Sequence, residues 1–107
     1  MLFLGINAFT KGYAFQFPEV KQREDSTTLQ QFAKVDEEVT ELGKSVYSAD
    51  DMNILVEAMD VIISVENLLR FYPDGQVQAA AHMVYEKNKA RNYWVDPDEE
   101  EVLNERV

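Results

Sequence analysis

Apolar positions recur with a helical period in the first half of the chain. They are Phe32, Val35, Val39, Leu42 and Val46, which follow one another at spacings of three and four residues. This spacing places them on one face of an α-helix. Ser26 or Thr27 can cap the start of that helix. The pattern therefore predicts a helix that runs to about Tyr47 and buries a single apolar stripe.

The next segment, from about Asp50 to Phe71, predicts a second helix that is apolar nearly all round. Ser48, followed three residues later by Asp51, resembles a capping box with aspartate in place of glutamate. A helix without a polar face has to be covered on every side. We therefore expect this helix to be the most buried element.

The residues "YPDG" end the second helix, because Pro73 cannot continue it and Gly75 suits a turn. Asp74 can cap a third helix from about Gly75 to Tyr93. Its inward face is predicted to carry Val77, Ala81 and Val84.

The two ends of the chain are harder to interpret. Residues 1–25 contain five aromatic residues and are broken up by Gly5, Gly12 and Pro18, which predicts one or two short helices joined by turns. Residues 95–107 form an acidic tail that is solvated or a short frayed helix. No strand pattern is visible. We expect one all-α domain over residues 1–107, an antiparallel helical bundle completed by formation of a homodimer or homotetramer.

Composition narrows the function classes. The chain has 107 residues, 46% of them hydrophobic, and a net charge of −10. That charge repels nucleic-acid polymers and anionic membranes, and the longest apolar stretch is too polar to span a bilayer. There is no cysteine, and the N-terminus lacks the pattern of a signal peptide. These features favour a cytoplasmic protein.

Two pairs of acidic residues share one helical spacing. Glu38 and Glu41 are three residues apart on the first helix, and so are Glu57 and Asp60 on the second. If the two helices pack antiparallel, the pairs can face each other. Four close carboxylates repel one another unless a cation lies between them. Magnesium prefers oxygen ligands and keeps waters that a phosphate can replace, and manganese can substitute for it.

The alternative to a metal site is a salt bridge from Glu57 and Asp60 to Lys34, Lys87 or Arg91. We favour the metal, because a charged pair on a helix that is otherwise apolar all round needs a strong partner. Glu37 points about 140° away from the apolar stripe at Leu42, which indicates a solvated position.

The segments "KVDEEVTEL" and "EAMD" together fit the pattern K-x-x-E-E-x-x-E-L followed by E-x-x-D. The chain resembles the MazG-like, all-α nucleotide pyrophosphohydrolases, which have a four-helix type of bundle and include dimeric dUTPases and dCTP pyrophosphatases. Downstream, "EKNKAR" followed by Tyr93 resembles the basic segment of the dCTP-pyrophosphatase branch. The resemblance covers roughly residues 29–94.

The resemblance implies magnesium-dependent hydrolysis of a nucleoside triphosphate to the monophosphate and pyrophosphate, as in nucleotide-pool housecleaning. The metal ligands carried over are Glu38, Glu41, Glu57 and Asp60. A ligand glutamate, Glu38 or Glu41, would also take the proton of the attacking water.

Candidate substrate contacts are basic or polar. Lys34 either contacts phosphate or forms a surface salt bridge with Glu38 or Glu37. On the third helix, Asn88 and Arg91 continue the apolar stripe and favour triphosphate or nucleoside contacts. Lys87 lies off that stripe, where solvation is an equal alternative.

Three other classes remain to be weighed. A non-catalytic helical interaction protein could keep the bundle without turnover. A di-iron bundle usually needs Glu-x-x-His pairs, and the single histidine, His82, follows Ala79 at that spacing. A phosphoribosyl-ATP pyrophosphohydrolase shares the acidic motif but usually has a Gly- and Arg-rich C-terminal segment, which is not seen here.

Overall fold

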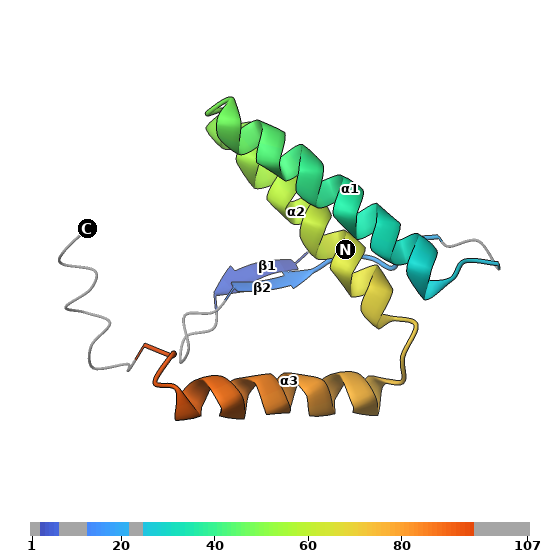
Figure 1. Cartoon of the computed structure of the whole chain (residues 1–107), viewed down its shortest axis with the longest axis vertical. Coiled ribbons are helices and arrows are strands. Elements are labelled where there is room, and N and C mark those ends of the chain that lie inside the picture. The colour runs from blue at the N-terminus through green and yellow to red at the C-terminus, as the bar shows by residue number, and fades with distance from the viewer. Residues whose placement is uncertain (1–2, 7–12, 22–24, 96–107) are drawn as a thin grey trace. The chain divides into compact units, whose positions relative to one another are not determined.

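A computed structural model describes residues 3–6, 13–21 and 25–95 of the chain. It contains two strands and three helices, drawn in Figure 1: β1 Phe3–Ile6, β2 Tyr13–Gln16, α1 Thr28–Tyr47, α2 Asp51–Leu69 and α3 Asp74–Ala90. The chain divides into two compact units. One comprises residues 19–73, with α1 and α2, and the other comprises residues 1–18 and 74–107. Organisation as a single domain stays a prediction.

The N-terminal segment corrects the expectation of short helices. β1 and β2 form an antiparallel pair in which Leu4 lies opposite Phe15 and Gly5 lies opposite Ala14. Aromatic residues at alternate positions favour extended backbone, and the rings of Phe15 and Phe17 stack with centroids 6.3 Å apart. The prediction that no strand occurs is therefore wrong here, whereas the three predicted helices are present.

The start of α1 confirms the predicted cap. Thr27 is the N-cap residue: its hydroxyl accepts a hydrogen bond from the backbone N–H of Gln30 at 3.2 Å. In return, the backbone N–H of Thr27 donates to the side-chain oxygen of Gln30 at 2.9 Å. This reciprocal pair is a capping box, which satisfies two backbone donors that a helix start leaves free.

The turn between α1 and α2 differs from the predicted cap. Asp50, not Ser48, is the N-cap of α2, and its carboxylate accepts from the backbone N–H of Asn53 at 3.1 Å. Ser48 instead ends α1, where its hydroxyl donates to the backbone carbonyl of Ser45 at 3.1 Å. Ala49 takes the left-handed conformation, with φ of 55°, that reverses the chain within three residues.

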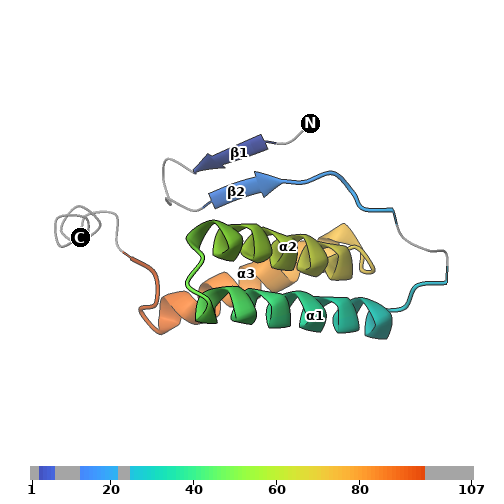
Figure 2. The same cartoon turned by 90° about the horizontal axis from the view of Figure 1, so that it is seen from above.

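Helices α1 and α2 pack side by side and antiparallel, as both views show (Figures 1 and 2). Their contact is polar near both ends. The side chain of Asn53 donates to the hydroxyl of Ser45 at 3.1 Å. At the other end, the side-chain amide of Gln31 donates to the carbonyl of Ser64 at 2.9 Å. Ser45 and Ser64 are only 3% and 4% exposed.

The predicted apolar stripe of α1 is only partly covered in the single chain, where Val35 and Leu42 are half-buried. Phe32, Val39 and Val46 are each about half exposed, between 48% and 57%. The covered face of α1 combines two residues of that stripe, Val35 and Leu42, with the polar residues Gln31, Glu38 and Ser45. Among the side chains that the structure describes, no hydrophobic one is buried. The prediction of a buried apolar stripe on α1 is therefore wrong for Phe32, Val39 and Val46 in one chain. The prediction that α2 is the most buried element is confirmed: among the three helices it holds most of the covered residues, including Ser64 and Asn67, two of the three buried ones described.

In the other unit, α3 ends at Ala90, three residues before the predicted end. Asn92 takes the left-handed conformation, and the N–H of Tyr93 donates to the carbonyl of Asn88 at 2.9 Å. The Trp94 ring stacks on Tyr85 at 5.7 Å, and its indole N–H donates to the Tyr85 carbonyl at 3.0 Å.

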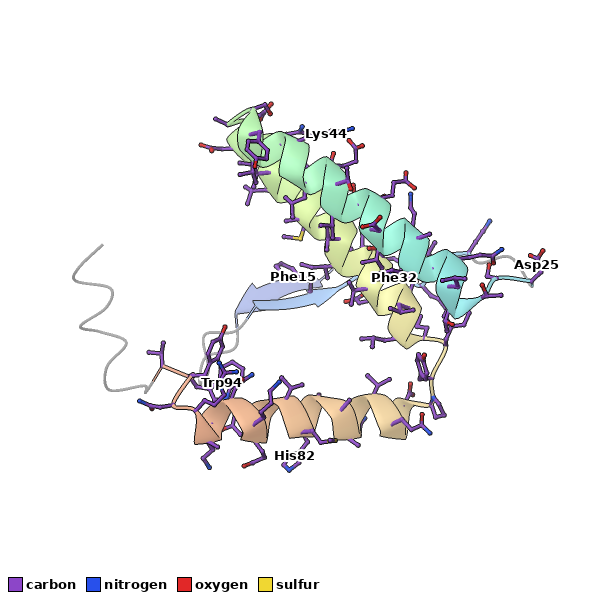
Figure 3. The ribbon with its side chains drawn as sticks, in the orientation of Figure 1. Phe15, Asp25, Phe32, Lys44, His82 and Trp94 are labelled. Carbon is purple, nitrogen blue, oxygen red and sulfur yellow. The ribbon has the colours of Figure 1, made fainter. Side chains whose placement is uncertain are left out.

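No residue of α3 is buried, so the predicted inward face of this helix is not confirmed. Val77 is half-buried, whereas Ala81 and Val84 are exposed. His82 and Trp94 are labelled on this unit in Figure 3. None of the three described helices combines the length and the apolar character needed to cross a membrane.

Candidate metal centre

Three carboxylates from the two packed helices come together. Glu38 of α1 and Glu57 and Asp60 of α2 each offer one oxygen, and these oxygens all lie within 4.8 Å of one another. The short turn between α1 and α2 makes the two helices antiparallel neighbours, so the acidic residues meet although they lie about 20 residues apart in the sequence. The predicted meeting of acidic pairs is therefore present for these three residues.

The donor set suits a small divalent cation. Magnesium binds oxygens at about 2.1 Å, which places neighbouring ligand oxygens about 2.9 Å apart and opposite ones about 4.2 Å apart. The observed limit of 4.8 Å is slightly wider than that. Small side-chain rotations are enough to close the difference, because each carboxylate is attached through flexible torsions. The three residues fit magnesium or manganese.

The electrostatics of the cluster favour a bound cation. Loss of solvent, followed by the charges of Asp60, Glu38 and Glu41, raises the pKa of Glu57 above its ordinary value. The side chain of Glu38 is only 14% exposed, and its carboxylate lies 2.9 Å from the ammonium of Lys34. That hydrogen bond is the main reason why the pKa of Lys34 is raised. One lysine against three carboxylates leaves a surplus of negative charge.

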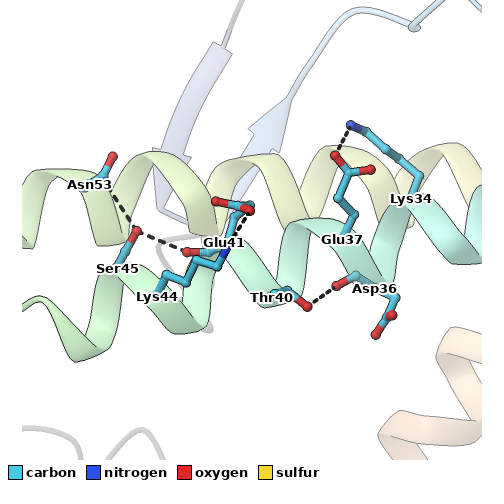
Figure 4. Close-up of polar contacts among 8 residues, drawn as sticks. All are labelled: Lys34, Asp36, Glu37, Thr40, Glu41, Lys44, Ser45 and Asn53. Atoms are coloured by element: carbon cyan, nitrogen blue, oxygen red, sulfur yellow. Dashed lines mark hydrogen bonds and ion pairs between the residues drawn. The ribbon is translucent and has the colours of Figure 1, made fainter.

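The remaining acids of α1 lie outside this group of three. Glu41 pairs with Lys44 at 3.2 Å, as drawn in Figure 4, and its side chain is 47% exposed. Its charge still reaches Glu57, whose pKa it helps to raise. A ligand role for Glu41 stays a prediction. Glu37 is 64% exposed and lies 3.6 Å from Lys34, in keeping with the solvated position expected for it.

A cleft of about 460 Å³ adjoins the carboxylates within the same unit. Glu38, Asp60 and Lys34 line it on the side of the carboxylates. The rest of the wall is formed mainly by polar residues, namely Lys21, Ser26, Gln31, Ser64 and Asn67, with Val20 and Ile63. The cleft therefore places two lysines and several hydrogen-bonding groups beside a candidate metal centre.

Sequence reasoning missed most of this wall. Ser64 and Asn67 follow Glu57 and Asp60 at spacings of four and three residues, so all four share one face of α2. That polar stripe on an apolar helix was the available signal. Lys21 has no such signal, because it precedes α1 in an irregular segment whose path the pattern does not predict.

The predicted substrate contacts of the third helix lie in the other unit. Lys87 and Asn88 belong to the last turn of α3, and Arg91 follows that helix directly. The carbonyl of Asn88 accepts from the N–H groups of Arg91 and Tyr93 and so helps to end the helix. A substrate role for these three residues stays a prediction.

Comparison with known protein families, with curated proteins and with solved structures finds no match. The resemblance to MazG-like pyrophosphohydrolases therefore rests on the quoted motifs alone.

Proposed function

We propose that the chain is a magnesium-dependent hydrolase that converts a nucleoside triphosphate to the monophosphate and pyrophosphate. The observation that carries this proposal is the convergence of Glu38, Glu57 and Asp60 from two helices. A cleft with two lysines adjoins them, so an anionic substrate has both room and counter-charge beside the metal ligands. The order of acidic motifs, which resembles that of MazG-like enzymes, supplies the reaction type.

Each group has a role in this proposal. Glu38, Glu57 and Asp60 would hold the cation, which when bound would supply positive charge for the phosphate oxygens and lower the pKa of a nearby water. Glu41 lies outside the three-carboxylate group but close enough to influence Glu57, so it can accept the proton of the attacking water. Glu38 is the alternative base, and Lys34 contributes positive charge beside the cleft.

The direct test is a panel of natural and damaged nucleoside triphosphates, with phosphoribosyl-ATP included. Each is incubated with the protein and magnesium, and the products are separated as monophosphate and pyrophosphate. We expect both products from at least one triphosphate, and none when a chelator removes the metal. Release of orthophosphate instead of pyrophosphate, or no turnover of any compound, would contradict the proposal.

We also propose that the chain forms a homodimer or a dimer of dimers. Phe32, Val39 and Val46 form an apolar stripe on α1 that remains about half exposed in one chain. Burial of apolar surface contributes about 25 cal/mol per Å². Packing of this stripe against the same stripe of a second chain is therefore favourable. Light scattering at micromolar concentration should give at least twice 12.3 kDa, the mass of one chain. A clean monomer would exclude the assembly.

The same stripe also favours a second candidate function. A non-catalytic helical protein would use its exposed apolar residues to bind a partner and would need no metal. The two functions differ in their response to magnesium. Binding of a partner that is unaffected by chelation, together with an inactive nucleotide panel, would favour the interaction protein.

A further inference from the structure

Lys34 takes part in two features at once. Its ammonium lies 2.9 Å from an oxygen of Glu38, and the residue also lines the cleft beside the carboxylates. Its side chain is 52% exposed, which leaves the long stem room to rotate. A second, longer contact joins it to Glu37 at 3.6 Å. Lys34 is thus the cation that neutralises Glu38 before any metal binds.

A divalent cation and an ammonium compete for this carboxylate. A cation held by Glu38, Glu57 and Asp60 would lie about 2.1 Å from the ligand oxygens and would repel a positive charge only a few ångströms away. The surplus negative charge that holds Lys34 at Glu38 would be cancelled at the same time. The ammonium therefore needs a new anionic partner, and the cleft that it already lines adjoins the metal ligands.

We propose that Lys34 exchanges partners: it pairs with Glu38 before metal loading and binds a substrate phosphate in the cleft once the divalent cation is in place. Lys21, which lines the same cleft, supplies a second positive charge for that anion. The inference rests on the proposed function and adds to it the order in which metal and substrate bind. The metal must bind first, because only then is Lys34 released to the polyphosphate.

The ligand chemistry is a chain of two or more phosphates. It could belong to an intact nucleoside triphosphate or to free pyrophosphate. Two probes separate these sources: inorganic pyrophosphate, and a nucleoside triphosphate whose α,β-bridging oxygen is replaced by an imido group to prevent cleavage. Equal affinity for both would assign the cleft to the phosphates alone.

The test compares Lys34→Met with Lys44→Met on the full chain. The two lysines lie on the same helix and each pairs with a glutamate, but Lys44 does not line the cleft. Calorimetry measures magnesium binding alone, and then binding of each phosphate probe with and without magnesium. A Lys34→Gln variant repeats the measurement with a polar side chain, and circular dichroism checks that each variant is helical.

In wild type we expect the probes to bind only after magnesium. Lys34→Met should bind magnesium about threefold more tightly, because a competing surface ion pair is removed. It should bind the phosphate probes about tenfold more weakly, because a charge-assisted hydrogen bond is lost. Lys44→Met should change either affinity by less than about twofold, as expected for a well-exposed pair.

Several results would overturn the exchange. These are magnesium affinity that is unchanged or weaker in Lys34→Met, probe binding that matches the Lys44 variant, or probe binding without metal. Failure of the proposed function looks different: wild type would show the predicted metal and probe binding, yet the nucleotide panel would stay inactive. If wild type binds magnesium but neither probe, the cleft is not a polyphosphate site.

Discussion

Two regions of the α1–α2 pair contain similar residues but differ in their balance of charge: the turn end, and the acidic region that extends from the middle of the pair to Gln31. At the end next to the connecting turn, Asn53 donates to Ser45 and Lys44 pairs with Glu41. Each of these groups has its partner within the turn end: Asn53 and Ser45 form a neutral hydrogen bond, and Lys44 balances the charge of Glu41. Nothing at this end calls for a ligand.

In the acidic region, where Glu38, Glu57 and Asp60 lie near the middle of α1 and α2, the charges are not balanced. Gln31 again links the helices, through the carbonyl of Ser64, but here Lys34 is the cation opposite three close carboxylates. Repulsion within this group contributes to the raised pKa of Glu57. Proteins often keep locally unfavourable arrangements, such as crowded carboxylates, at functional sites, where they reduce stability in exchange for function. We therefore expect substitutions at the turn end to change stability, and we propose the acidic region as the site of the chemistry.

The largest expected effect is in the acidic region. Glu57→Gln and Asp60→Asn should each weaken magnesium binding by about 100-fold or more, since even changes behind the direct ligands cost 10- to 100-fold. The matched control is Glu66→Gln on the same helix, whose carboxylate lies 3.8 Å from Arg70 and outside the cluster. Calorimetry measures all three. Wild-type affinity in both cluster variants would remove the metal centre from these residues.

The turn end should respond in stability instead. Asn53→Ala removes the side-chain bond to the buried Ser45. We expect a loss of about 1 kcal/mol in the free energy of unfolding and a fall in melting temperature of roughly 4–8 °C. Magnesium affinity should stay at the wild-type value. An Asn53→Ala variant that keeps its melting temperature but binds magnesium more weakly would reverse the comparison between the two regions.

The pH dependence of stability should also distinguish the acidic region from the turn end. Because the pKa of Glu57 is raised in the folded chain, the folded state holds that proton more tightly than the unfolded state does. The stability from this group is present below its ordinary pKa and is lost as pH rises through the raised value. Without metal, Glu57→Gln should therefore melt higher than wild type near neutral pH, and the difference should vanish at low pH.

Magnesium should reverse this ranking of melting temperatures near neutral pH. It needs the deprotonated carboxylate of Glu57 and therefore stabilises only the wild type. Thermal melts from pH 4 to pH 8, with and without magnesium, measure the effect. A pH-independent difference between the two proteins would show that Glu57 is not in a perturbed environment.

The smallest effect is expected at Glu37. Its side chain is 64% exposed, and its contact with Lys34 is the longer of the two that this lysine makes. Glu37→Gln should change the free energy of unfolding by less than about 0.5 kcal/mol and magnesium affinity by less than about twofold. Calorimetry and thermal melts on this variant serve as the baseline for Glu57→Gln. A large loss of metal affinity would extend the centre to the first acid of the motif.

Helical periodicity and caps predicted the helices well, because those signals are local. Thr27 at the start of α1 and Pro73 before α3 act within a few residues of the helix ends. The acidic group was predictable for the same reason: spacing places Glu57 and Asp60 on one face, and a short turn makes α1 and α2 antiparallel. The motif alone could not show that Glu41 pairs with Lys44 outside the group.

Features that depend on contacts between distant parts of the chain could not be predicted from such local patterns. An apolar stripe indicates that a helix face will be covered, but not by which surface. Phe32 and Val39 are apolar and half exposed, whereas Gln31 and Ser45 face α2. The residues of the N-terminal hairpin carry too short a pattern for period two to stand out, so the crowded aromatics were read as helix. The wall of the cleft also includes Val20, Lys21 and Ser26, which precede α1 in an irregular segment whose position periodicity does not predict.

The most direct test of the central claim is to locate a bound metal on the chain. Manganese broadens the amide signals of nearby residues in a ¹⁵N–¹H spectrum, and a 12.3 kDa chain is well suited to that measurement. At substoichiometric manganese, we predict that broadening begins around Glu38, Glu57 and Asp60 and leaves the turn end and α3 sharp. Broadening centred on the acidic tail, residues 95–107, or spread evenly over all acidic residues, would contradict the account.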